Sequence, residues 1–288
     1  MEISRKDFLK GAAGATGLLL LQPPAIALAK DTQTRDGMAM LIDVTKCVNC
    51  WWCYAACKKS NKLPETRKPD LEDPPELSPD IWTTLQPVKQ GDRWVSRKKA
   101  CNHCTEAACV EVCPTGALSY NHLGFVQYDK EKCSGCGYCA EYCPFGVPQM
   151  EKNNTITGVA IMNKCTFCQD RVTNGEQPAC AAACTTGAIT YGKRTDLITQ
   201  AQERITELGR QNVDASAYGI NELNGLHVMY ILDSSPEVYG LPADPQVPAA
   251  GTVRDIFKWL GSGLAIAALA GFGLNYLVAR LRLRGEEK

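Results

Sequence analysis

Sixteen cysteines are the residues of this 288-residue chain whose type and spacing point most directly to chemistry. They form four groups of four: the first and third are spaced C-x2-C-x2-C-x3-C, the second C-x2-C-x4-C-x3-C, and eleven residues separate the two halves of the fourth. Thiols in such numbers form disulfides, bind zinc or hold iron–sulfur clusters. The groups are Cys47, Cys50, Cys53 and Cys57; Cys101, Cys104, Cys109 and Cys113; Cys133, Cys136, Cys139 and Cys143; and Cys165, Cys168, Cys180 and Cys184.

The spacing favours iron–sulfur clusters over the two alternatives. Disulfides suit an exported chain with an even number of cysteines, but neighbouring C-x2-C pairs would close many small, strained loops. Zinc takes two C-x2-C pairs per ion, whereas the first and third groups present three cysteines in a row and a fourth just beyond. The spacing C-x2-C-x2-C-x3-C, followed by proline, is typical of bacterial ferredoxins, where the fourth cysteine binds the other cluster of a pair. Pro114 and Pro144 follow the second and third groups.

Lysines accompany all four cysteine groups. Lys46, Lys132 and Lys164 directly precede the first cysteine of three groups, and Lys98 and Lys99 stand just before the remaining one. Because a [4Fe–4S] cluster with four thiolates carries net negative charge, we interpret these lysines as partial charge compensation, with solvated surface lysines as the alternative.

The elements around the groups are short, and they repeat. The lead-in Asp43-x-x-Lys46-Cys47 resembles Asp129-x-x-Lys132-Cys133, and Thr-Gly-Ala follows both Cys113-Pro114 and Cys184-Thr185. Such duplication indicates a repeated unit. Apolar runs predict strands at 117–120, 125–128, 188–191 and 226–232, and periodicity predicts an amphipathic helix at 195–208. We expect an α+β fold in which the clusters act as structural staples, so that the apo chain is poorly folded.

Both ends of the chain carry membrane-related signals. Residues 1–29 have the basic, apolar and A-x-A parts of an export signal and resemble a twin-arginine signal. Residues 259–279 contain no charged side chain and are long enough for one transmembrane helix. The arginines after it predict a cytoplasmic C-terminus, with the bulk of the protein on the periplasmic or outer side of the membrane. Residues 58–94 are expected to be an inserted Pro-rich loop, 233–253 a linker, and 254–288 the anchor and tail.

Composition excludes some functions. The 31 Lys and Arg residues balance 31 Asp and Glu residues, so nothing suggests the basic stripe of a nucleic-acid-binding protein. The chain has three histidines, His103, His122 and His227, and no convincing nucleophile–base set. We expect packing or hydrogen bonding for His103, and no catalytic residues in this chain.

Four cysteine groups in this order resemble the four-cluster ferredoxin-type subunits of membrane-bound redox complexes. These include the β subunits of formate dehydrogenase, dimethyl sulfoxide reductase and related molybdopterin enzymes, and the ferredoxin-like subunit of some nickel–iron hydrogenases. The resemblance runs from about Met38 to Val278. The sequence from Lys164 to Arg171 resembles the family's fourth group, and 227–230 and 236–242 resemble the formate dehydrogenase β subunit.

The resemblance implies four [4Fe–4S] clusters and their ligands. One ferredoxin-like unit is split between 38–57 and 160–232, and the second, 95–150, is inserted in it. The implied ligand sets are Cys47, Cys50, Cys53 and Cys184; Cys57, Cys165, Cys168 and Cys180; Cys101, Cys104, Cys109 and Cys143; and Cys113, Cys133, Cys136 and Cys139.

The expected function is electron transfer between an exported catalytic subunit and a membrane cytochrome b or quinone-reactive subunit, in a formate dehydrogenase-type molybdopterin complex. The first alternative is the ferredoxin-like subunit of a membrane-bound nickel–iron hydrogenase. A freestanding membrane-anchored ferredoxin is a second alternative. An enzyme that reduces a small substrate directly would need an open coordination position, and sixteen cysteines for four clusters leave none.

Overall fold

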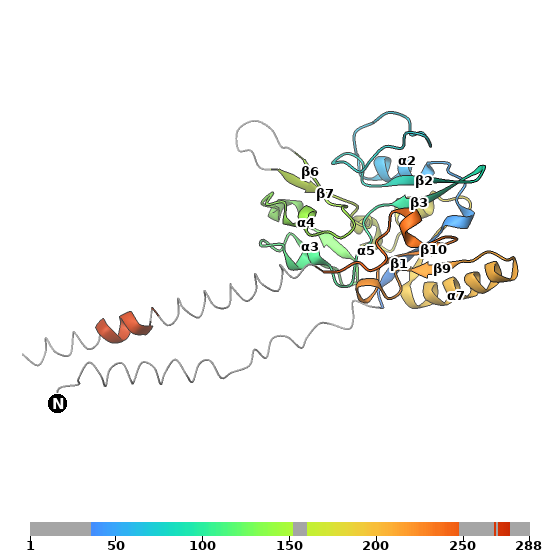
Figure 1. Ribbon diagram of the computed structural model, residues 1–288. Coiled ribbons are helices and arrows are strands. Elements are labelled where there is room, and N and C mark those ends of the chain that lie inside the picture. Colours follow the sequence, from blue (N-terminus) through green and yellow to red (C-terminus); the bar gives the residue numbers. More distant parts are fainter. Residues whose placement is uncertain (1–35, 152–159, 248–267, 269, 277–288) are drawn as a thin grey trace, which may run out of the picture. The chain divides into compact units, whose positions relative to one another are not determined.

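The computed structural model of the chain describes residues 36–151, 160–247, 268 and 270–276 (Figure 1). The cysteine-bearing unit spans residues 32–248. Its main sheet has four strands in the order β8-β1-β10-β9. Their bounds are Ile189–Lys193 for β8, Met38–Asp43 for β1, Val228–Leu232 for β10 and Ser216–Tyr218 for β9. The first strand of the chain therefore lies inside a sheet whose other strands come from its second half.

The two central strands, β1 and β10, run parallel, with Leu41 opposite Met229. Both strands are almost continuously apolar and buried, as expected where both faces of a sheet are covered. One face, including Leu41 and Met229, packs against the amphipathic helix α7 (Arg194–Arg210), which Figure 1 shows along the sheet. The opposite face, including Met40 and Tyr230, packs in the cluster that contains Cys53 and Cys180.

Short helices and two-stranded hairpins make up the cysteine-bearing side of the unit. The helices are α2 (Trp52–Ser60), α3 (Ala108–Glu111), α4 (Tyr138–Glu141), α5 (Gln169–Thr173) and α6 (Ala179–Ala182), with 3-10 turns at Val44–Lys46, Lys130–Lys132, Glu222–Asn224 and Pro236–Tyr239. The hairpins are β2 (Thr84–Gln90) with β3 (Arg93–Lys99), β4 (Leu118–Tyr120) with β5 (Val126–Tyr128), and β6 (Gln149–Glu151) with β7 (Ile161–Asn163).

The predicted helix at 195–208 and the four predicted strands are confirmed to within two residues at each end. The prediction that 58–94 is entirely loop is wrong, because α2 extends to Ser60 and β2 begins at Thr84. Pro87 lies within β2, opposite Ser96. β2 pairs only with β3, and proline is tolerated on such an edge strand. Leu85 and Val95 are buried and fix the hairpin.

The predicted export signal at 1–29 lies outside the described residues. The predicted membrane helix at 259–279 lies mostly outside them, although residue 268 and residues 270–276 are helical. Within the described part of the chain, no helix has both the length and the apolar character needed to cross a membrane.

Candidate metal centres

The fold brings the sixteen cysteines together in four sets, which draw on groups far apart in sequence. Cys47, Cys50, Cys53 and Cys184 line one cavity (site I). Cys57, Cys165, Cys168 and Cys180 line a second (site II). Cys101, Cys109 and Cys143 are electrostatic neighbours of Cys104 (site III). Cys113, Cys133, Cys136 and Cys139 line another cavity (site IV). These sets have the same members as the ligand sets that the resemblance implied, and all sixteen thiols are free.

Each site neighbours the next in the order I to IV, and this series is called the line of sites. The Cys53 thiol of site I interacts with Cys180 of site II. The Cys101 thiol of site III interacts with Cys165 of site II. Further along, Cys109 of site III interacts with Cys139 of site IV.

The two ends of the line reach the surface. Cys50 of site I and Cys136 of site IV are exposed, whereas at least one cysteine of every site is buried or nearly so. Large apolar side chains are exposed beside both: Val48 and Trp52 near site I, and Tyr138 near site IV.

A tight turn presents three thiols at sites I and IV. In the first cysteine group, Asn49 and Trp51 have left-handed backbone conformations, with φ of 59° and 61°. At the equivalent positions of the repeat, Gly135 and Gly137 have φ of 70° and 79°. The turn ends where α2 or α4 begins, so Cys53 and Cys139 lie in the first turn of a helix. The backbone is therefore the same in both loops although only one of them uses glycine.

Burial keeps most of the thiols neutral. It raises the pKa of Cys53 to about 12, against the attraction of Lys98, and it raises the pKa of Cys168 to about 11, helped by the neighbouring Cys165. At site IV, burial also acts to raise the pKa of Cys133, but the neighbouring polar groups, which include backbone N–H groups at Met162 and Gly135, outweigh it and the pKa is lowered. Binding of iron to the buried thiols must therefore displace protons.

Two fully buried lysines show that the sites are built for negative charge. The Lys98 side chain lines the site I cavity, and its ammonium nitrogen is buried with no hydrogen-bond partner among the residues that the structure describes. Burial acts to lower the pKa of Lys98, but the electrostatic effect of the Cys180 and Cys165 sulfurs outweighs it and the pKa is raised. The Lys164 ammonium donates to the carbonyl oxygens of Cys165, at 3.0 Å, and Val126, at 3.4 Å. A buried cation is expensive unless an anion lies beside it. The thiol sets and these cations therefore fit negatively charged iron–sulfur clusters.

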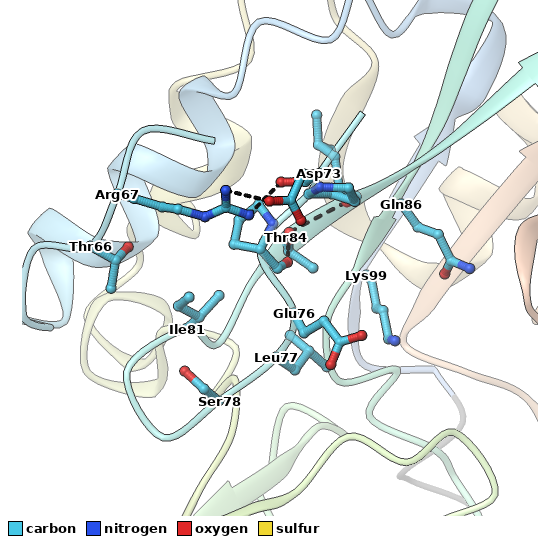
Figure 2. Close-up of a pocket in the computed structure, with 13 residues that line it drawn as sticks. Thr66, Arg67, Asp73, Glu76, Leu77, Ser78, Ile81, Thr84, Gln86 and Lys99 are labelled. Carbon is cyan, nitrogen blue, oxygen red and sulfur yellow. Dashed lines mark hydrogen bonds and ion pairs between the residues drawn. The ribbon is translucent and has the colours of Figure 1, made fainter. Parts of the chain in front are cut away.

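The lysines singled out in the sequence divide into two kinds. Lys98 and Lys164 are buried beside thiols, as charge compensation requires. Lys46 and Lys132 instead form ion pairs with Asp43 and Asp129 three residues earlier, at 3.8 and 2.9 Å, and their side chains are 39% and 62% exposed. Lys46 and Lys132 are therefore surface lysines, which was the alternative to charge compensation. Lys99 lines a cavity that contains no cysteine (Figure 2).

The cavity in Figure 2 has a volume of about 740 Å³ and lies against β2, β3 and the segment before them. The Arg67–Asp73 ion pair lies on its wall, and both side chains are exposed. Without thiols, this cavity is no candidate for a cluster.

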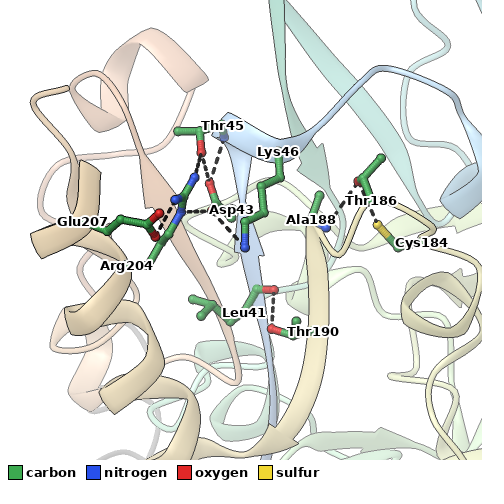
Figure 3. Close-up of polar contacts among 10 residues, drawn as sticks. All are labelled: Leu41, Asp43, Thr45, Lys46, Cys184, Thr186, Ala188, Thr190, Arg204 and Glu207. Atoms are coloured by element: carbon green, nitrogen blue, oxygen red, sulfur yellow. Dashed lines mark hydrogen bonds and ion pairs between the residues drawn. The ribbon is translucent and has the colours of Figure 1, made fainter. Parts of the chain in front are cut away.

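An ion-pair network missed in the sequence anchors the first cysteine group (Figure 3). Arg204 of α7 donates to the Asp43 carboxylate at 2.9 Å and to the Thr45 hydroxyl at 3.2 Å. Asp43 ends β1, and its carboxylate accepts from the Thr45 backbone N–H at 2.9 Å, which caps the turn before Cys47. Nothing in the sequence joined Arg204 to Asp43, since 161 residues separate them.

The three histidines lie in different surroundings. His103 is fully buried and contacts the Phe125 and Phe167 rings edge-on, at centroid distances of 6.1 and 5.0 Å. Its pKa is lowered, chiefly by burial and also by Lys164, so the ring is neutral. A nitrogen of the His227 ring lies 2.8 Å from the Met38 carbonyl oxygen, and His122 is exposed. The expected packing role describes His103.

Comparison with known proteins agrees with this geometry. Two models described as "4Fe-4S dicluster domain" match residues 46–117 and 93–194. The chain is 36% identical to the formate dehydrogenase iron–sulfur subunit of Haemophilus influenzae, over 83% of this chain and 82% of that protein. It is also 36% identical to the formate dehydrogenase-O iron–sulfur subunit of Escherichia coli, over 86% and 82%. The hydrogenase-2 operon protein HybA of E. coli O157:H7 is 29% identical over 96% and 95%.

The two dicluster matches together contain all sixteen cysteines, which fit four [4Fe–4S] clusters. Identity above 30% over more than four fifths of two proteins is far more than the cysteines alone provide. The chain is therefore an electron-transfer protein and belongs to the family of formate dehydrogenase iron–sulfur subunits.

Proposed function

We propose that this chain conducts electrons between a catalytic molybdopterin subunit that oxidises formate and a membrane cytochrome b or quinone-reactive subunit. The observation that carries the proposal is the line of four thiol sites that reaches the surface at Cys50 and at Cys136. A protein that only stored electrons would need one exposed end. When bound, the clusters supply one-electron oxidation and reduction. The chain itself is non-catalytic, because four cysteines for each cluster leave no coordination position for a substrate.

Each site is proposed to hold one [4Fe–4S] cluster through its four cysteines. The protein positions these ligands with the left-handed turns at 49–51 and 135–137, and it shields them with the packed face of the sheet. Sites I and II take ligands from both ends of the cysteine-bearing unit, whereas sites III and IV take theirs from 101–143. The pairing of β1 with β8 supports the nested arrangement, in which the unit at 95–150 is inserted into the unit made of 38–57 and 160–232.

Serine variants test the ligand sets. We expect Cys184→Ser to alter the same electron paramagnetic resonance signal as Cys47→Ser, because both ligate the cluster at site I. Cys165→Ser should alter a different signal, that of site II. The proposal is wrong if Cys184→Ser and Cys165→Ser alter one signal and Cys47→Ser another, since each cysteine group would then hold its own cluster.

We also propose that the protein is exported and anchored in the cytoplasmic membrane by residues 259–279, with the clusters on the periplasmic or outer side and the C-terminus inside. Support comes from the signal-like residues 1–29, the uncharged span and the arginines after it. Protease added to intact spheroplasts should digest the cluster domain and spare a tag on the C-terminus.

Metal analysis of the complex extracted from membranes in mild detergent tests the partner. The four clusters predict about sixteen irons per copy of this chain, beyond those of its partners. Molybdenum or tungsten, with clusters that are reduced by formate, would support the proposed catalytic partner. Nickel without molybdenum or tungsten would instead identify a hydrogenase, the alternative to which the HybA relative points. A chain that purifies alone would indicate a freestanding ferredoxin, and zinc in place of iron would contradict the electron-transfer proposal.

A further inference from the structure

Lys98 lies where sites I and II meet. It belongs to β3, lines the site I cavity and is 2% exposed. The thiols that interact with it are Cys53 of site I and Cys165 and Cys180 of site II. Its ammonium nitrogen is buried without a hydrogen-bond partner among the described residues. A buried ammonium needs an anion or an acceptor, and the groups that act most strongly on this one are the Cys180 and Cys165 thiols, followed by Tyr230 and Cys53.

Lys164 occupies the equivalent position between sites II and III. It is also 2% exposed, and it interacts with Cys101, Cys109 and Cys143 of site III as well as with Cys165 of site II. Two backbone carbonyl oxygens accept from its ammonium and fix its place. The lysines come from different elements, β3 and the loop after β7, yet each faces thiols of two neighbouring sites.

No fully buried lysine lies beside site IV among the described residues. Backbone N–H groups act on the thiols of Cys133 and Cys113, and the Thr115 hydroxyl lies 3.7 Å from the Cys113 sulfur. The neighbouring lysine of site IV, Lys132, is 62% exposed and paired with Asp129. Polar groups and solvent therefore surround the thiols of site IV, whereas buried lysines lie beside the thiols of sites I, II and III.

We propose that Lys98 and Lys164 are shared counter-ions, each placed between two successive clusters, which stabilise the reduced form of the clusters on both sides. Lys98 acts on the clusters at sites I and II, and Lys164 acts on those at sites II and III. This inference rests on the proposed ligand sets. Reduction adds an electron to an already negative cluster, and a nearby cation in a poorly screened interior favours that step. The lysines thus couple neighbouring clusters electrostatically without ligating either.

Redox titration of the intact complex, followed by electron paramagnetic resonance, tests the counter-ions. Signals are first assigned with the cysteine variants described above. We expect Lys98→Met to lower the reduction equilibrium constants at sites I and II at least tenfold, which is about 59 mV for a one-electron couple. The cluster at site IV should keep its potential. Lys164→Met should lower the constants at sites II and III by a similar factor, and Lys98→Arg should retain most of the wild-type potential.

Lys99→Met is the matched control, because Lys99 is the next residue of β3 and lines the cavity without thiols (Figure 2). The inference is overturned if Lys98→Met shifts the potentials at sites I and II no more than Lys99→Met does, or if it shifts all four sites equally. Should Lys98→Met lose iron from sites I and II, retention of that iron in Lys98→Arg would support the counter-ion, and equal loss in both variants would overturn it. A wild-type complex without four clusters would instead contradict the proposed function itself.

Discussion

Replacing Arg204 by methionine should destabilise the cysteine-bearing unit, because it leaves a buried carboxylate without its closest cation. The Arg204 Nε lies 2.9 Å from the Asp43 carboxylate, and the two side chains are 18% and 5% exposed. Asp43 also caps the turn that leads into Cys47. The ion pair therefore holds α7, the end of β1 and the first cysteine group together (Figure 3).

The size of the effect follows from what remains around Asp43. Removing one partner of a fully buried ion pair costs about 3–5 kcal/mol. Here the carboxylate keeps the Thr45 backbone N–H and hydroxyl, and Lys46 at 3.8 Å. Arg204 is also partly exposed, so we expect a loss of about 2–3 kcal/mol. With a dependence of roughly 2–3 kcal/mol per molar urea, the midpoint of unfolding should fall by about 1 M.

Urea titration of the holo chain, followed by its visible iron–sulfur absorption, measures this shift. Lys132→Met is the matched control, because Lys132 pairs with Asp129, which stands where Asp43 does in the repeat, and these side chains are 62% and 43% exposed. Such a surface pair contributes about 0–1 kcal/mol. If Arg204→Met lowers the midpoint no more than Lys132→Met does, the reasoning about the buried pair is refuted. Asp43→Asn combined with Arg204→Met should cost less than the sum of the single changes.

Two further predictions concern the loops and the clusters. Gly135→Ala should disrupt the turn at site IV and lower the iron content, because the added Cβ would lie 1.9 Å from the Ala160 carbonyl oxygen; Gly116→Ala, which has a similar φ of 67° and open space around it, should cost only about 1 kcal/mol of stability and keep all its iron. Removal of iron by a chelator under reducing conditions should abolish the cooperative unfolding transition seen by far-UV circular dichroism, because the apo chain loses its staples; an unchanged transition would show that the apolar core holds the fold alone.

The cysteine pattern was the strongest predictor of the site, because spacing in a loop is a local property. Three thiols within seven residues, a left-handed turn between them and a short helix after them all follow from neighbouring residues. Four of the strands, β4, β5, β8 and β10, and the helix α7 were also predicted, since apolar periodicity marks their buried faces. The partnership of Cys184 with Cys47 came from the resemblance, and spacing alone left it open.

Burial of the lysines could not be read from the sequence. Lys46, Lys132 and Lys164 each stand directly before a first cysteine. Only Lys164 is buried, and its ammonium donates to two backbone carbonyl oxygens, whereas Lys46 and Lys132 pair with an aspartate three residues earlier and are 39% and 62% exposed. Similarly, the hairpin β2–β3 escaped prediction because its pairing is stabilised by contacts with distant residues, such as the Arg97 side chain with the Tyr239 carbonyl oxygen.

The place of β1 in the sheet has a consequence for synthesis. This strand emerges early from the ribosome, but both of its hydrogen-bonding neighbours, β8 and β10, follow almost 150 residues or more later. In the interval, the six residues of β1, five of which are apolar, have no strand paired with them on either edge. A strand with unpaired edges pairs most readily with another chain. Pairing across such sequence separations is also slow. The nascent chain therefore needs protection over β1 until its last third is made, so premature termination before β8 should yield aggregates rather than a smaller folded protein.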